Sequence, residues 1–429
     1  MFSKKWRTSE REFAVLVEND FKIRTRDGTN LNADIFRPDN KKDKFPAILG
    51  IHPYLSNQSP SIKPKANSTS AGGWAAGVEK PNSAMEAGDP EFYARRGYAH
   101  VICNLRGTDL SEGIYDFVGV KELEDVYDVI EWLANQPWCN GNVGMFGVSY
   151  FAWIQQFAAS ANPPHLKCIF APYAATDFYR DVVYHGGILS LWGLGWRKLL
   201  DNVRVKSQTL SDLGETRFKE ALDAALRNED LRSSPKVMEV LKDPHVGENP
   251  VAADWILHQL EDAFWHQRQV KYEKINVPSY LGADWGIYGL HLPGAFRSWE
   301  NINAPKMMTL GPPVNLDRPV YQLQYESLRW FDHWLKGIDT GIMDEAPIKI
   351  FVMGANDWKE TKEWPLPETR WTPFYLHENN LLSEHEFWPN EMFDSFEDSP
   401  WGRGSLEYYS PPLVEKTEVV GPIVLNVFG

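Results

Sequence analysis

The sequence contains few cysteines, no excess of basic residues and no metal-ligand motif. Its 429 residues include only three cysteines, Cys103, Cys139 and Cys168. They form no Cys-x-x-Cys pair and two lie in apolar runs, so we interpret them as reduced packing residues rather than disulfides or metal ligands. The net charge of −14 disfavours nucleic-acid binding, because an acidic surface repels phosphates. With neither His-x-x-x-His spacing nor a Gly-rich phosphate loop, we expect no metal and no cofactor.

Long apolar runs are also missing. The longest candidate, residues 186–196, is bounded by His185 and Arg197 and falls short of the roughly 20 residues that cross a bilayer. The first residues, MFSKKWRTSEREF, lack the hydrophobic core of a signal peptide. We therefore expect a cytoplasmic protein without membrane contact. The sequence leaves the oligomeric state open, and a homo-oligomer is one alternative.

What the chain does contain is an alternation of strands and helices. Short apolar runs predict strands at 47–51, 98–105, 143–147, 167–171, 278–283 and 306–310, and helical periodicity predicts helices at 121–137, 150–160 and 320–336. This alternation predicts an α/β fold with a mainly parallel sheet. Residues 176–270 carry helical patterns without a clear strand, which indicates a helical cap inserted in an α/β domain at 1–345.

The sequence pattern changes after Ile342. From there on, strand-like segments are separated by Gly, Pro and Asn. We predict a C-terminal β-sandwich at 346–429. Only about four or five such segments follow residue 345, whereas a jelly roll needs about eight. The final apolar run, 422–428, would also leave an unpaired edge. The sequence thus predicts a truncated β domain and a chain that is a fragment.

The stretch GNVGMFGVSYFAW, residues 141–153, carries the main chemical signal. An apolar strand stops at Gly-Val-Ser and restarts as a helix, which is the pattern of a nucleophile elbow with Ser149 at its tip. A serine hydroxyl needs a base for its proton and donors for its oxyanion. The elbow places the backbone N–H of Tyr150 as one such donor. Phe151 replaces the final glycine of the usual Gly-x-Ser-x-Gly pattern.

Several stretches around this elbow resemble the CocE/NonD hydrolases, which include cocaine esterase-like enzymes, α-amino-acid ester hydrolases and X-Pro dipeptidyl-peptidases. They are EWLANQPWCNGNVGMFGVSY (131–150), RRGYAHVICNLRGTDLSEG (95–113) and the segment 331–365. The resemblance implies an α/β-hydrolase core, a helical cap and a C-terminal jelly-roll-like β-sandwich. It also implies that Tyr54, in His-Pro-Tyr after the strand 47–51, donates its hydroxyl to the oxyanion.

The acid and the base follow the chain order Ser, Asp, His of this fold. Asp284 ends the strand-like stretch VPSYLGADW and is our candidate acid. The family's histidine position is filled by Asn315, which cannot accept a proton at neutral pH. His291 follows Asp284 and is our candidate base, and His185 of the cap is the next choice. A structural role remains the alternative for both histidines.

These residues favour a serine hydrolase that cleaves acyl esters or amides of small molecules or peptides. The cap and the 18 tryptophans favour an apolar or aromatic substrate group. An X-Pro dipeptidyl-peptidase or α-amino-acid ester hydrolase is the alternative, because acidic residues of the cap would hold an α-amine. These charges alternate with Arg and Lys, however, which favours a solvated helix face. A catalytically impaired binding protein is the alternative of another class, motivated by Asn315. The acidic cap residues are Asp201, Glu215, Glu220, Asp223, Glu229 and Asp230.

Overall fold

A computed structural model describes most of the chain. The residues described are 6–54, 86–196, 207–247, 250–286, 289–312, 323–386, 393–396 and 404–426. Within them, no helix is long and apolar enough to cross a membrane. All three cysteines are buried free thiols.

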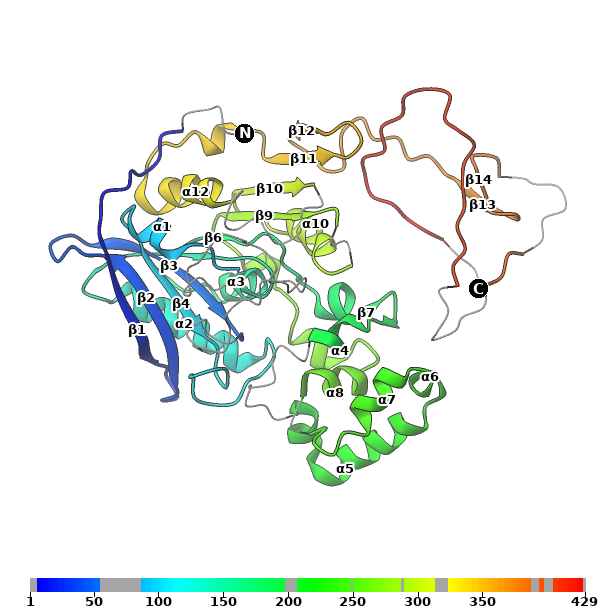
Figure 1. Ribbon diagram of the computed structural model, residues 1–429, viewed down its shortest axis with the longest axis horizontal. Helices are drawn as coiled ribbons and strands as arrows, with labels where there is room; N and C mark the ends of the chain where they lie inside the picture. Colours follow the sequence, from blue (N-terminus) through cyan, green and yellow to red (C-terminus); the bar gives the residue numbers. More distant parts are fainter. Residues whose placement is uncertain are drawn as a thin grey trace, which may run out of the picture.

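A ten-stranded sheet forms the centre of the molecule (Figure 1). Its strand order is β1-β2-β4-β3-β5-β6-β9-β10-β11-β12, and the neighbours from β4 to β11 are all parallel. The strands predicted from apolar runs all lie in this sheet, because each run is buried on both faces. The bounds are β1 Val15–Arg24, β2 Asn30–Pro38, β3 Phe45–His52, β4 Ala99–Asn104, β5 Cys139–Phe146, β6 Leu166–Phe170, β9 Ser279–Asp284, β10 Lys306–Gly311, β11 Ile348–Val352 and β12 Asp357–Thr361.

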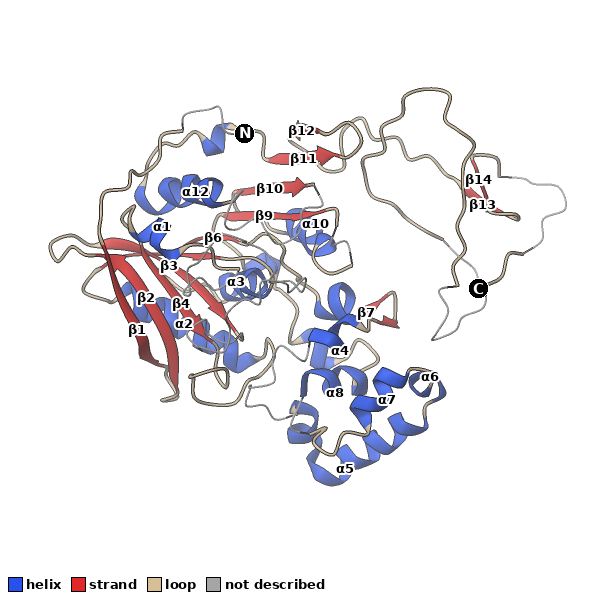
Figure 2. Ribbon diagram, in the orientation of Figure 1, coloured by secondary structure: helices blue, strands red, loops and turns tan. Residues whose placement is uncertain are grey.

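Helices cover both faces of the sheet (Figure 2). One core cluster joins α2 (Val120–Ala134), α3 (Tyr150–Ser160) and α10 (Leu292–Asn301) to one face, and a second cluster joins α1 (Pro90–Ala94) and α12 (Gln324–Lys336) to the other. Strand side chains alternate between the two: Met145 of β5 belongs to the first cluster and Phe146 to the second. The sandwich of helices around a parallel sheet is the predicted α/β-hydrolase architecture.

A helical cap lies between β6 and β9. A bridge between Asp177 and Gln269 closes its base, close to the predicted limits 176 and 270. The cap has its own apolar cluster, formed by residues such as Leu231, Leu241 and Ile256. Its elements are η1 Tyr179–Val183, β7 Tyr184–His185, β8 Ile188–Leu189, α4 Trp192–Trp196, α5 Gln208–Arg227, α6 Glu229–Arg232, α7 Pro235–Leu241, α8 Pro250–Leu257 and α9 Ala263–His266, and η3 Tyr272–Lys274 leads back to β9.

The C-terminal region differs from the sequence prediction at its start. We placed the strand-like segment KIFVMG in a separate β domain beginning at residue 346, but β11 pairs with β10 and β12 pairs with β11 in the central sheet. Burial explains this, because Ile348 and Ile350 are fully buried in the main core. Strand periodicity does not reveal which sheet a strand joins.

Beyond β12, the described residues contain a short antiparallel pair, β13 Tyr375–His377 and β14 Leu381–Ser383. Apolar side chains near the end of the described chain are largely exposed to solvent. Ile423 and Val424 expose 87% and 68% of their surface. A fuller β-sandwich of jelly-roll type stays a prediction.

Candidate active site

Ser149 stands at a strained turn between β5 and α3. Its backbone angles are φ 57° and ψ −124°, a conformation that non-glycine residues rarely adopt. Backbone strain of this kind costs of order 1–3 kcal/mol and is retained where function depends on it. Helix α3 begins at Tyr150, directly after the serine, and its first turn is anchored by N–H groups of Ala152 and Trp153 that donate to the Ser149 carbonyl. The predicted nucleophile elbow is therefore present.

Phe151 is accommodated in place of the usual glycine because two other glycines surround it. A Cβ atom on Gly147, which has φ 139°, would lie 2.4 Å from the Cβ of Phe151. A Cβ on Gly50 of β3 would lie 3.2 Å from the Phe151 ring. The ring itself is buried and stacks on His52 with 4.8 Å between centroids. The close packing needed at the elbow is thus supplied by Gly147 and Gly50.

Tyr54 lies next to the elbow, after the neighbouring strand β3. Its N–H donates to Nδ1 of His52 at 3.1 Å, and its carbonyl accepts a hydrogen bond from Asn104 at 2.7 Å. Its ring lies edge-on to the ring of Tyr150, with 6.4 Å between centroids. Burial lowers the pKa of His52 to about 3, so this histidine is neutral and can accept the Tyr54 N–H. The structure thus brings both predicted oxyanion residues to the same edge of the sheet.

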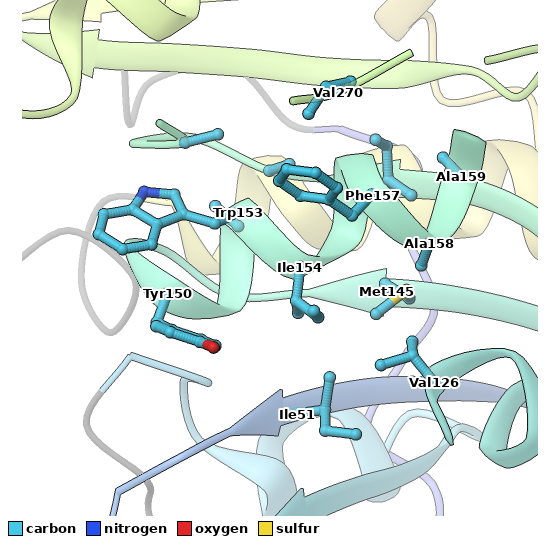
Figure 3. Packing of buried hydrophobic residues seen from close by; sticks show 14 of the residues in the cluster. Ile51, Val126, Met145, Tyr150, Trp153, Ile154, Phe157, Ala158, Ala159 and Val270 are labelled. Carbon is cyan, nitrogen blue, oxygen red and sulfur yellow. The ribbon is translucent and has the colours of Figure 1, made fainter. Parts of the chain in front are cut away.

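The side chain of Tyr150 is held away from the elbow by a buried polar group. Its hydroxyl donates to Glu122 at 2.9 Å and accepts a hydrogen bond from the Tyr115 hydroxyl at 3.0 Å. Figure 3 shows Tyr150 and Trp153 at the start of α3, with Ile154 pointing toward Ile51. These contacts set the orientation of the first turn of α3. The backbone N–H of Tyr150 belongs to that turn and lies directly after Ser149.

Asp284 ends β9, two strands away from β5, and is completely buried. The hydroxyl of Tyr173 donates to its Oδ2 at 3.1 Å, and the N–H of Gly286 donates to its Oδ1 at 2.6 Å. Tyr173 follows β6, the strand between β5 and β9, and has a positive φ of 63°. Tyr173 was not singled out by the sequence, because nothing in its neighbourhood marks it as a partner of Asp284.

His291 is buried at the start of α10. Its Nδ1 accepts a hydrogen bond from Nε1 of Trp153 at 3.4 Å, and its ring lies edge-on to Tyr173 with 5.9 Å between centroids. Burial lowers the pKa of His291 to about 3. Asp284 and His291 therefore share Tyr173 as a neighbour.

The other candidates for the base lie further from the elbow or beyond the described residues. His185 belongs to the β7–β8 hairpin of the cap, and its Cε1 lies 4.0 Å from the position a Cβ on Gly289 would take. This places His185 beside the loop that leads to His291. Asn315 lies outside the described residues.

Glu86 is a residue at the elbow that sequence reasoning missed. Its carbonyl accepts the N–H of Val148 at 3.1 Å, which places Glu86 beside the elbow, and the residue is buried. Burial raises the pKa of Glu86 to about 8, and the Ser149 hydroxyl opposes this effect. Glu86 is a single acidic residue in the stretch AMEAGD, about sixty residues before Ser149. No motif in that stretch indicates that it lies near the serine.

A hollow of about 490 Å³ lies between the core and the cap. Its walls come from the loop after β4, from the start of α2 and from the start of α5, with Tyr115 and Gln208 among the lining residues. Arg106 in the first of these walls is fixed by two hydrogen bonds to Asp125 of α2. Among the described residues, no group of three or more His, Cys, Asp or Glu side chains is arranged to hold a metal ion.

Comparison with known proteins shows the family to which the chain belongs. Residues 27–314 match the X-Pro dipeptidyl-peptidase (S15 family), which is more than half of the chain. The chain belongs to this family. Residues 340–428 match the X-Pro dipeptidyl-peptidase C-terminal non-catalytic domain, so the C-terminal β region is shared with the family as well. The resemblance to CocE/NonD hydrolases is confirmed.

Several relatives are similar over most of this chain. Cocaine esterase from Rhodococcus sp. (strain MB1 Bresler) is 29% identical over 84% of this chain and 62% of its own length. Xaa-Pro dipeptidyl-peptidase from Lactobacillus helveticus (strain DPC 4571) is 22% identical over 90% of this chain and 51% of its own length. The crystal structure of a CocE/NonD family hydrolase from Staphylococcus aureus has a TM-score of 0.65 at 27% identity, covering 86% of this chain and 60% of that protein. The chain thus spans between half and two thirds of the length of these relatives.

Proposed function

We propose that this protein is a serine hydrolase that cleaves acyl ester or amide bonds through an acyl-enzyme on Ser149. The observation that carries the proposal is the strained Ser149 backbone at the strand–helix turn, next to Tyr54 and the first turn of α3. This arrangement supports an oxygen nucleophile at Ser149, with the Tyr54 hydroxyl and the first turn of α3 as donors for the developing oxyanion. The names of the relatives, an esterase and a dipeptidyl-peptidase, agree with this reaction class.

In the proposed reaction, Ser149 Oγ attacks the carbonyl carbon of the substrate, and the carbonyl oxygen becomes an oxyanion. The Tyr150 N–H and the Tyr54 hydroxyl stabilise that charge, and α3 adds the positive end of its dipole. The tetrahedral intermediate then expels the alcohol or amine, and water hydrolyses the acyl-enzyme. Asp284 and His291 remain the acid and the base that the sequence predicts. Their common contact with Tyr173 supports this pairing.

For the substrate, we propose an acyl ester of a small molecule ahead of a peptide with a free α-amine. An α-amine would need a carboxylate directed into the site. The acidic residues of the cap that we considered for this role, such as Glu215, Glu220 and Glu229, are exposed to solvent in the described part of the cap. Their exposure supports the interpretation that they form a solvated helix face rather than a binding site for an α-amine. We also propose a cytoplasmic location, because three buried free thiols suit a reducing compartment.

The experiment that tests the function is labelling with a fluorophosphonate probe, followed by sequencing of the modified peptide. The modified residue should be Ser149, and p-nitrophenyl esters should be hydrolysed by the same preparation. A protein that neither reacts with the probe nor hydrolyses esters would support the second candidate, a hydrolase-fold binding protein. That candidate is motivated by Asn315 and by the lowered pKa of His291.

A further inference from the structure

A buried carboxyl group, that of Glu86, lies beside the elbow that carries Ser149. Glu86 is only 6% exposed, and the nearby Ser149 hydroxyl lowers the pKa that burial raises. Among the described residues, its Oε2 atom has no hydrogen-bond partner although it is shielded from solvent. A buried polar atom without a partner is costly and calls for an explanation. One carboxyl oxygen is therefore open to accept or release a proton inside the site.

The segment of Glu86 is fixed to the elbow by its backbone. The Glu86 carbonyl accepts the Val148 N–H, one residue before the nucleophile. The next residue, Ala87, is fully buried and packs in one apolar cluster with Phe151. Asp89 caps the N-terminus of α1 through its side chain. The carboxyl group is therefore held beside Ser149, as a group that exchanges protons with it must be.

We propose that Glu86 is the general base, and subsequently the general acid, that moves the Ser149 proton. This inference rests on the proposed function and names the group that completes its site. Asn315 stands where the family pattern has a histidine. In our proposal, the Glu86 carboxyl group performs the proton transfer that the imidazole of that histidine would perform.

Atoms and charges balance in this scheme. The Glu86 carboxylate takes the Oγ proton as the bond from Oγ to the carbonyl carbon forms, and the carbonyl electron pair moves to the oxygen. When the bond to the leaving group breaks, Glu86 returns the proton to the leaving oxygen or nitrogen. Water then attacks the acyl-enzyme, gives its proton to Glu86, and Glu86 returns it to Ser149 Oγ. The pocket carries one negative charge throughout, first on Glu86 and then on the oxyanion.

The acidity of Glu86 suits this role. A base is most effective when its pKa lies near the working pH. Burial raises the pKa of Glu86 to about 8, and the Ser149 hydroxyl partly offsets this rise. By contrast, burial lowers the pKa of His291 to about 3, far below neutral pH. Burial thus makes the Glu86 carboxylate a better proton acceptor and His291 a poorer one.

The direct test is Glu86→Gln, assayed on one p-nitrophenyl ester. Gln keeps the shape and polarity of the side chain, but it cannot take a proton. We expect kcat/KM to fall at least about 100-fold. The wild-type profile should rise with pH through about 8, and the variant should lose that rise. Glu86→Asp should retain the rise at a reduced rate, because a carboxyl group remains.

The matched control is Glu91→Gln in the same segment. This carboxylate pairs with Arg95 at 2.9 Å on the surface of α1, so the same chemical change should leave kcat/KM within about twofold. Surface substitutions have only small effects on stability. Equal losses in both variants would mean that the segment tolerates no change, and would overturn the role of Glu86.

A second measurement needs no activity. A carboxyl group whose pKa is raised on folding adds stability below its unfolded pKa, about 4.5, and loses it as pH rises through its folded pKa, about 8. Glu86→Gln removes this dependence. The Tm of the variant, relative to wild type, should therefore rise between pH 5 and pH 9. A constant Tm difference over that range would contradict the proposed proton exchange.

The two proposals fail in different ways. If wild type hydrolyses the ester, Ser149→Ala does not, and Glu86→Gln keeps both rate and pH profile, the serine mechanism stands and Glu86 is not the base. A profile that rises near pH 7 and is lost in His291→Ala would overturn Glu86 in favour of the histidine. If Ser149→Ala remains active, the proposed function itself is wrong.

Discussion

Two sides of the candidate site are held by different kinds of contact. On the nucleophile side, Ser149 and Tyr54 follow the neighbouring strands β5 and β3, and their backbones are fixed within a few residues of each strand end. On the acid–base side, Asp284 and His291 depend on the side chains of Tyr173 and Trp153, which come from other elements. The nucleophile side is thus encoded locally, whereas the acid–base side depends on how distant segments pack.

The difference matters for function because the two sides can change independently. A turn that carries strain, such as the one at Ser149, persists only when surrounding packing maintains it. A proton-transfer group needs only proximity and a suitable pKa, so different residues can fill that role. The hydrogen bond between the Glu86 carbonyl and the Val148 N–H brings a carboxyl group to the nucleophile side itself, where we propose that it acts as the base.

Ser149→Ala should have the largest effect, which would confirm that the chemistry lies on the nucleophile side. We expect ester hydrolysis to fall about 1,000-fold or more, because no acyl-enzyme forms without Oγ. Probe labelling should disappear while the circular dichroism spectrum stays unchanged. Unchanged turnover would exclude the serine mechanism.

Tyr54→Phe should have the next largest effect. It removes the hydroxyl and keeps the ring that packs against Tyr150. Loss of one oxyanion donor costs on the order of 100-fold in kcat, with little change in KM. A change confined to KM would mean that Tyr54 only lines the binding site.

Ser149→Gly tests the strain at the elbow. Glycine adopts a positive φ readily, whereas alanine keeps the strain of serine. We expect Ser149→Gly to be more stable than Ser149→Ala by about 1 kcal/mol in chemical denaturation. If alanine were the more stable variant, the turn would not be strained in solution.

Tyr173→Phe addresses the acid–base side. It removes the hydroxyl that donates to Asp284. We expect a loss of about 1–2 kcal/mol in the free energy of unfolding, because a buried carboxyl group loses a hydrogen bond. Thermal denaturation measures this, with Tyr127→Phe on the half-buried face of α2 as the control. Equal stability of the two variants would show that Tyr173 does not support Asp284.

The sequence predicted most of the central sheet because parallel strands buried on both faces appear as continuous apolar runs. It also placed the cap, where helical periodicity replaces the alternation. It grouped β11 and β12 with the C-terminal domain, because the pairing partner of a strand is set by tertiary contacts. Sequence similarity in the family covers this junction too, with the C-terminal match starting at residue 340.

By itself, the sequence determined where the candidate nucleophile, Ser149, lies. An apolar strand, Gly147, Ser149 and a helix follow one another within a few residues, so local chain geometry is sufficient. Only the tertiary structure decided that Glu86 lies beside the elbow and that Tyr173 contacts Asp284. Glu86 and Tyr173 lie far from Ser149 in the sequence, and neither belongs to a periodic pattern or a motif. Their proximity arises because parallel strands end at one edge of the sheet and bring their following loops together.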